Sequence, residues 1–157
     1  MTLMDAPKYN ASRENRNRNL GIAAVVILIV AFAAGISFYL DMPWQLWHLP
    51  SDHRVNQFFS AIEGGNLQKA YALWNNDPNW QQHPTQYSVY NFDQFQKDWG
   101  PASDYGVIKS HKIIVAKTVG NGVVMGVDIN GGKTPIFLRV DHTKTIGFSP
   151  VELYTGP

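Results

Sequence analysis

Three side chains of one loop-rich segment have the residue types that acid–base catalysis needs. His83, Tyr87 and Asp93 lie in the stretch NDPNWQQHPTQYSVYNFD, and an imidazole, a phenol and a carboxylate can exchange protons once burial tunes their pKa values. A structural role accounts for the same residues, because Asp93 falls in the first turn of an expected helix and His83 precedes a proline. We favour the structural role and assign no catalytic residue.

Aromatic side chains around this segment could line a pocket for a small apolar ligand. Aromatic rings at helical spacing are expected to be core residues first, so the pocket is the alternative interpretation. His83 and Asp93 would then lie at its mouth. The candidate lining residues are Tyr71, Trp74, Trp80 and Trp99.

The composition excludes several other kinds of site. The chain has no cysteine, and its five histidines show no close ligand spacing, so neither a disulfide nor a metal site is expected. The glycines near residues 121 and 131 belong to hairpin turns with no following helix, so no phosphate loop and no cofactor are expected. The net charge of +1 gives no basic field that would attract nucleic acid.

The elements that must position these residues begin with a membrane anchor. Residues 20–40, LGIAAVVILIVAFAAGISFYL, contain no charged side chain. At about 1.5 Å per residue they span about 31 Å, which matches a hydrocarbon core of about 30 Å. Aromatic side chains gather at the end of this segment, where they are expected to lie at the membrane–water interface: Tyr39, Trp44 and Trp47.

The flanking charges predict the orientation. Arg13, Arg16 and Arg18 precede the segment and Asp41 follows it, so residues 1–19 are expected to form a disordered cytoplasmic tail. Residues 41–50 would be a juxtamembrane linker, and the domain would lie outside the cytoplasmic membrane, in the periplasm or its equivalent.

A cleaved signal peptide is the competing interpretation of the same segment. Ala31, Phe32 and Ala33 fit the small-residue pattern of a cleavage site. The apolar run continues to residue 40, however, where the start of a mature chain would turn polar. We therefore expect a retained single-pass anchor.

Residues 51–157 are expected to form one α+β domain. Ser51 can cap a helix whose apolar face is formed by residues 55, 58, 59 and 62, and Gly64-Gly65 ends it. Asn66 can cap a second helix, and Asn91 a third one that ends at Gly100-Pro101. A short strand is expected at residues 86–90.

From residue 105 onward the apolar pattern has a period of two. It predicts strands at residues 107–119, 123–130, 134–141 and 145–153, joined by tight turns at Asn121-Gly122 and Gly131-Gly132 and by a loop at 142–144. Such hairpins make the sheet antiparallel.

Parity along the strands predicts an aliphatic face that packs on the helices. It consists of Ile114, Ala116, Thr118, Val123, Met125, Val127, Ile136, Leu138, Val140, Ile146 and Phe148. The opposite face receives His111, Lys117, Asp128 and Asp141 together with the residues that we expect at an interface, Val115, Val124, Phe137 and Arg139. The helix-facing surface would hold no acid–base pair, which argues against catalysis unless a bulge shifts the register.

This order of elements resembles the nuclear transport factor 2-like (cystatin-like cone) superfamily. The stretch HRVNQFFSAIEGGNLQKAYALW is similar to the opening helical hairpin of that superfamily, and the resemblance covers residues 53–153. It implies three helices packed on a curved antiparallel sheet of four to five strands. The superfamily includes isomerases, dehydratases, ligand-binding modules and adaptors, so the resemblance supports a fold rather than a function.

The sequence therefore predicts a membrane-anchored, non-enzymatic binding or assembly module. Its expected partners are the lipid bilayer and a second copy of the chain or a larger membrane complex. A small-molecule acid–base enzyme of the isomerase or dehydratase kind, with an apolar pocket, is the alternative.

Overall fold

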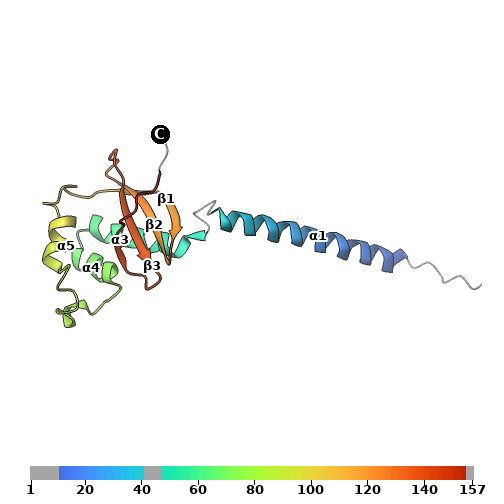
Figure 1. The fold of residues 1–157 in the computed structure, drawn as a ribbon, viewed down its shortest axis with the longest axis horizontal. Coiled ribbons are helices and arrows are strands. Elements are labelled where there is room, and N and C mark those ends of the chain that lie inside the picture. Colours follow the sequence, from blue (N-terminus) through green and yellow to red (C-terminus); the bar gives the residue numbers. More distant parts are fainter. Residues whose placement is uncertain (1–10, 41–46, 155–157) are drawn as a thin grey trace, which may run out of the picture. The chain divides into compact units, whose positions relative to one another are not determined.

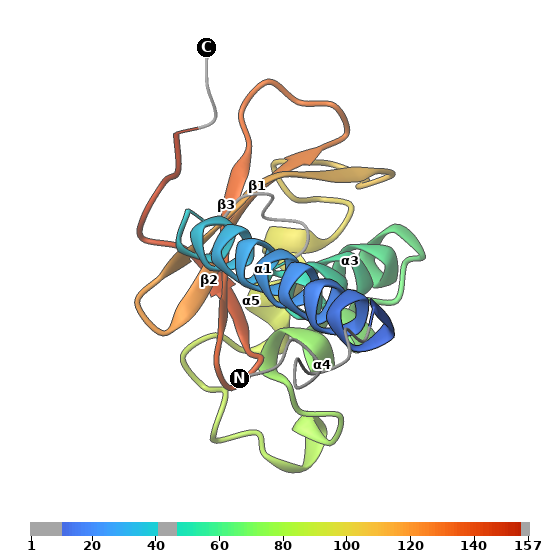
Figure 2. The same ribbon diagram turned by 90° about the vertical axis from the view of Figure 1, so that its right-hand side faces the viewer.

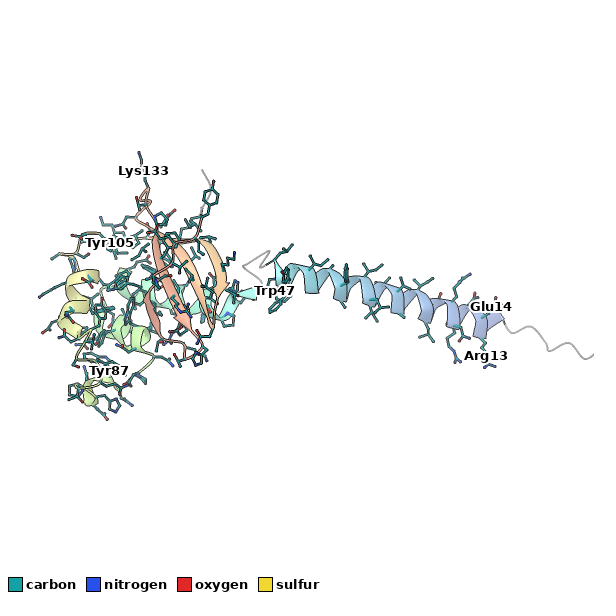
Figure 3. All side chains as sticks on the ribbon, in the orientation of Figure 1. Arg13, Glu14, Trp47, Tyr87, Tyr105 and Lys133 are labelled. Atoms are coloured by element: carbon teal, nitrogen blue, oxygen red, sulfur yellow. The ribbon has the colours of Figure 1, made fainter. Side chains whose placement is uncertain are left out.

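The computed structural model describes residues 11–40 and 47–154, which belong to two compact units divided between Leu40 and Asp41. The first unit contains one helix, α1 (Ala11–Tyr39). Its apolar side chains are exposed on every side (Figure 3), and an 18-residue window within it has a mean hydropathy of 2.7. By length and composition, α1 is able to cross a membrane.

Helix α1 begins earlier than the apolar segment. Residues 11–19, which were expected to be disordered, are helical, because adding turns to an existing helix avoids the cost of nucleation. Tyr39 lies in the last turn and is 86% exposed. Trp47 is the first described residue of the second unit, whereas Trp44 and residues 1–10 lie outside the described residues.

The second unit has an α+β fold, as predicted (Figure 1). Its helical elements are α3 (Leu49–Glu63), α4 (Leu67–Asn75), the short 3-10 helix η2 (Trp80–Gln82) and α5 (Phe92–Trp99). They are followed by β1 (His111–Val119), β2 (Gly122–Ile129), β3 (Ile136–Asp141) and β4 (Ile146–Phe148). The strands form an open antiparallel sheet in the order β1-β2-β3-β4.

Local sequence signals set most helix ends. Asn66 accepts a hydrogen bond from the Lys69 amide at the start of α4, and Asn91 and Gln94 form a capping box at the start of α5. The expected N-cap at Ser51 is wrong, because α3 already begins at Leu49 with Pro50 in its first turn. Proline fits there, since the first amides of a helix need no internal partner.

Aromatic rings fill the space between the helices and the sheet. Phe58 lies at the centre, with its ring centroid 5.0 Å from that of Trp99 and 5.5 Å from that of Trp74. Phe95 and Tyr71 complete this cluster, and their centroids are 5.1 Å apart. The sheet contributes Ala116, Met125, Val127, Ile129, Leu138, Val140 and Ile146 to the same core.

The register of β2, β3 and β4 is as predicted. Met125 pairs with Leu138, and Leu138 pairs with Phe148. The residues of β1 face the predicted sides only from Val115 onward, because a β-bulge interrupts the pairing between Ile113 and Val115. One extra residue reverses the facing of every residue before it. Ile113, rather than Ile114, therefore packs against the core, and the placement of His111 on the outer face is wrong.

Three strands are shorter than predicted, and β3 begins at Ile136 rather than at residue 134. The backbone amides of Lys109 and Ser110 donate to the Asn130 side-chain oxygen instead of to a neighbouring strand, so β1 starts only at His111. Strand β4 ends at Phe148, and Pro150 has no N–H to continue a ladder.

The strand expected at residues 86–90 is absent. This stretch forms turns and bends, and the segment between α4 and α5 extends away from the rest of the domain (Figures 1 and 2).

The outer face of the sheet has its own small apolar cluster. Gly126 pairs with Val115 on one side and with Phe137 on the other. A Cβ atom at Gly126 would lie 2.8 Å from Val115 Cγ1 and 3.1 Å from a Phe137 ring carbon. The glycine therefore gives the two side chains room to close over the strand. β1 is one edge of the sheet, and Lys112 and Lys117 on it are exposed.

Candidate functional site

A polar group lies on the helix-facing side of the sheet, where the sequence predicted none. The Nδ1 atom of His111 is 2.7 Å from Glu63 Oε1, and its Nε2 atom is 2.7 Å from Asn56 Oδ1. Its ring stacks on Phe59 with the centroids 4.8 Å apart. Both ring nitrogens are therefore engaged in this arrangement. Neither nitrogen is left for a substrate.

A carboxylate one turn before Asn56 adds to this group. Burial raises the pKa of Asp52, and His48 and His111 act in the opposite direction. One carboxylate oxygen of Asp52 has no hydrogen-bond partner among the described residues. His48, Asp52 and Asn56 follow one another at intervals of four residues, which places them on one face of the chain around α3. The spacing of four residues is visible in the sequence. The facing of His111 toward α3 is not, because it depends on the bulge in β1.

The segment between α4 and α5 forms a second candidate site. A cleft of about 230 Å³ is lined by two of the four expected pocket residues, Tyr71 and Trp80, and by two of the candidate acid–base residues, Tyr87 and Asp93. Tyr71 and Trp80 meet edge to face with their centroids 4.8 Å apart. Pro84, Asn91 and Phe92 complete the lining.

Two of the expected pocket residues are core residues instead. Trp99 is 1% exposed and Trp74 is 6% exposed, and their rings pack 5.7 Å apart among the other core aromatics. Neither lines the cleft. The interpretation of aromatic side chains as core therefore holds for these two, whereas Trp80 lies at the surface segment.

His83 and Tyr87 both contact Asp77, a residue for which the sequence indicated no role. Asp77 Oδ2 is 2.8 Å from His83 Nδ1 and accepts a hydrogen bond of 2.8 Å from the Tyr87 hydroxyl. Asp77 Oδ1 accepts a third bond from the Asn79 amide. The pKa of Asp77 is lowered, first by its bond to His83 and then by the other donors. The pKa of Tyr87 is raised to about 12, first by burial and then by its bond to Asp77.

This arrangement is that of a structural turn rather than of a proton-transfer site. A carboxylate that already accepts from three donors is held in its charged form and is a poor base. Asp93 lies in the first turn of α5, as the structural interpretation expects. His83 does not line the cleft.

The expected interface residues lie on the outer face but are not fully exposed. Val124 is completely buried, and Val115 and Phe137 are half-buried around Gly126. All three guanidinium nitrogens of Arg139 are engaged, with Asp141, the Val119 carbonyl and Asn121. Arg139 thus fixes the β1–β2 turn.

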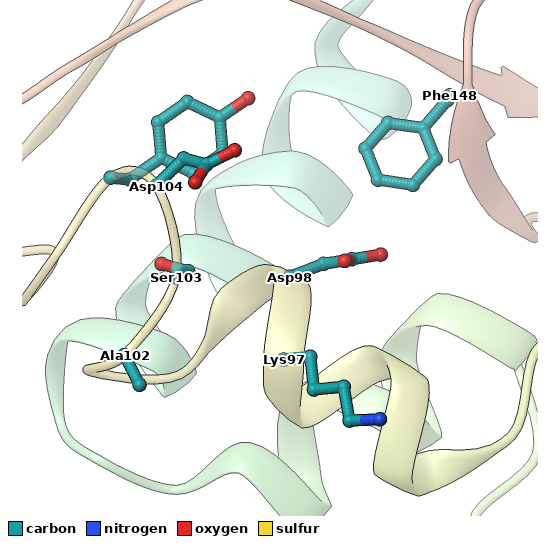
Figure 4. A pocket seen from close by; sticks show the side chains of 7 residues that line it. Lys97, Asp98, Ala102, Ser103, Asp104 and Phe148 are labelled. Carbon is teal, nitrogen blue, oxygen red and sulfur yellow. The ribbon is translucent and has the colours of Figure 1, made fainter.

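A third candidate site is a cavity where α5, the following loop and β4 meet (Figure 4). Its volume is about 380 Å³, and its lining residues are Lys97, Asp98, Ala102, Ser103, Asp104, Tyr105 and Phe148. Tyr105 and Tyr87 lie at different ends of the domain (Figure 3), so this cavity is separate from the cleft. Within residues 11–40 and 47–154, no three or more His, Asp or Glu side chains are arranged to hold a metal ion.

Comparisons with known proteins identify no relative. No protein-family model, no curated protein and no solved structure matches this chain.

Proposed function

We propose that this chain is a single-pass membrane-anchored, non-enzymatic binding module whose domain lies outside the cytoplasmic membrane. The observation that supports the anchor is α1, whose long apolar stretch is exposed on all sides. A soluble chain would have to cover such a surface, whereas a bilayer stabilises it.

The proposed orientation is based on charge. Arg13, Arg16 and Arg18 lie in the first turns of α1, before its apolar part. Lys and Arg next to a membrane segment favour the cytoplasmic side. The α+β domain would then follow on the opposite side.

The absence of catalysis is supported by the polar groups that the fold assembles. His111 has both ring nitrogens engaged by Glu63 and Asn56, and Asp77 accepts from three donors. The interior that a cone-shaped enzyme would use as its pocket is filled by aromatic rings. These observations favour binding at the surface of the domain, and the resemblance to nuclear transport factor 2-like proteins remains a prediction about its shape.

The experiment that tests this proposal uses the lack of native cysteines. Single-cysteine variants Ser12→Cys and Lys133→Cys place one thiol before the apolar part of α1 and one on the β2–β3 turn of the domain, and both positions are exposed. In intact cells, or in spheroplasts where an outer layer blocks access, a membrane-impermeant maleimide should label only the Lys133→Cys variant. The Ser12→Cys variant should react after lysis, and both proteins should stay in the membrane pellet after alkaline extraction.

Two results would overturn the proposal. The first is a soluble mature protein whose mass shows a start near Ala34. The second is the reverse labelling pattern, with the Ser12→Cys variant reacting from outside.

A further inference from the structure

The lining of the cavity between α5 and β4 includes two aromatic rings, those of Tyr105 and Phe148. Trp99 is buried beneath it, and its ring is nearly parallel to that of Phe148, at an interplanar angle of 6° and a centroid distance of 5.8 Å. Tyr105 stacks on Trp99 as well, at 23° and 6.1 Å. Tyr105 is 41% exposed and Phe148 is 48% exposed. Two aromatic side chains held by one buried indole thus present surface to the cavity.

Two carboxylates share this cavity with the rings. Asp98 accepts a hydrogen bond from the Tyr90 hydroxyl at 2.9 Å, which fixes its position and leaves one oxygen for another donor. Asp104 has no hydrogen-bond or ion-pair partner among the described residues. Burial raises the pKa of Tyr105, and Asp104 and Asp98 raise it further, so both carboxylates act on the phenol from nearby.

The only other charged group of the lining is Lys97. Figure 4 shows the side chains of Lys97 and Asp98 leaving α5 toward the same side, so Lys97 offsets the charge of only one of the two carboxylates. The cavity therefore has a net negative charge beside aromatic faces, which carry the negative end of the ring quadrupole. Both features attract a cation, and the combination is typical of sites for ammonium groups.

We propose that this cavity binds a small organic cation with a quaternary ammonium head, with Tyr105 and Phe148 against its methyl groups and Asp98 and Asp104 balancing its charge. This inference rests on the proposed binding function, to which it adds the chemical class of the ligand. An anion would be repelled by the two carboxylates, and an apolar ligand would have to displace their hydration. A volume of about 380 Å³ is sufficient for a ligand of this size.

The probe that tests the inference is choline, compared with 3,3-dimethyl-1-butanol, which has the same shape and no charge. Both are titrated against the full chain in maltoside micelles, which have no choline head groups, and binding is followed by ligand-observed NMR. Choline should bind and the neutral analogue should bind much more weakly. Asp104→Asn, which keeps the shape and removes the charge, should weaken choline binding by about threefold to tenfold.

Two further variants separate the contribution of the aromatic ring to choline binding from a general effect of charge. Phe148→Leu should weaken choline binding by about twofold to fivefold through loss of the ring face. Asp128→Asn removes the same charge from β2, outside the cavity lining, and should leave binding unchanged. A circular dichroism spectrum equal to that of the parent chain shows that each variant is folded.

Three outcomes would overturn the inference: no choline binding at millimolar concentration, equal binding of the neutral analogue, or an Asp104→Asn variant that binds as well as the parent. None of these outcomes bears on the proposed membrane anchor and its orientation, which are tested separately by membrane fractionation and by the labelling of the cysteine variants.

Discussion

The His111 ring and the Glu63 carboxylate join two elements that are 48 residues apart in the chain, with Nδ1 of the ring 2.7 Å from Oε1 of the carboxylate. His111 is the first residue of the edge strand β1, and Glu63 is the last residue of α3. The second bond from His111, to Asn56, contacts the same helix about two turns earlier. The start of β1 is thereby fixed to the helical layer.

We predict that His111→Leu lowers the free energy of unfolding by about 1–3 kcal/mol, because it leaves Glu63 and Asn56 without their shared donor in a half-buried place. Urea unfolding of the full chain in micelles measures the change. His142→Leu is the matched control, since His142 is exposed on the β3–β4 loop. A His111→Leu midpoint equal to that of the control would contradict the structural role of His111.

We predict that Gly126→Ala destabilises the domain by about 1–3 kcal/mol, because the new methyl group would overlap Val115 and crowd Phe137. Gly147→Ala in β4 is the control, because a Cβ atom there meets nothing within 4 Å. That variant should be neutral or slightly more stable, since alanine restricts the unfolded chain. Thermal unfolding followed by circular dichroism distinguishes the two, and equal melting temperatures would refute the packing of the outer face.

We predict an alkaline loss of stability that depends on Tyr87. Its pKa is raised to about 12 from 10.0, first by burial and then by its bond to Asp77. A folded-state pKa above the unfolded one means that the stabilising contribution is complete below pH 10 and is lost as the pH rises toward 12. Tyr87→Phe should remove this component from the pH dependence of the melting temperature.

Tyr154→Phe is the control for the alkaline experiment, because Tyr154 is 85% exposed. Its melting curve should follow that of the parent chain at every pH. If Tyr87→Phe and the parent lose stability in parallel between about pH 9 and about pH 11.5, the Tyr87–Asp77 bond does not contribute.

We predict that the full chain forms a homodimer in micelles through the outer face of the sheet. Phe137→Glu should shift the sedimenting species toward the monomer, because it places a charge among apolar side chains. Lys133→Glu, on the exposed β2–β3 turn, should have no effect. A parent chain that stays strictly monomeric at high concentration would exclude this interface.

The sequence predicts the elements of the domain well because their ends depend on local chemistry. The caps at Asn66 and Asn91 and the turn at Gly131-Gly132 each follow from one or two residues, and they bring β2, β3 and β4 into the expected register. The bulge at Ile114 depends on how β1 pairs with β2, and no single residue in the local sequence predicts it. That single residue determines where His111 points.

The candidate sites were harder to predict, because they combine distant segments. His83 and Tyr87, which are close in sequence, do lie together in the structure. Both contact the Asp77 carboxylate, for which the sequence indicated no role. The cavity of Asp98, Asp104 and Phe148 depends on β4 returning beside α5. Trp74 and Trp99 are of the right type for a pocket, and only the packing shows that they are core residues.

The edge strand β1 combines two exposed lysines, Lys112 and Lys117, with a bulge between them. Charged side chains and an irregular edge both discourage the addition of a further strand from a neighbouring molecule. Copies of this domain that meet at this edge are therefore not expected to pair their β1 strands into one larger sheet. An amyloid-like fibre would have to grow from the other edge, where β4 offers a strand of only three residues.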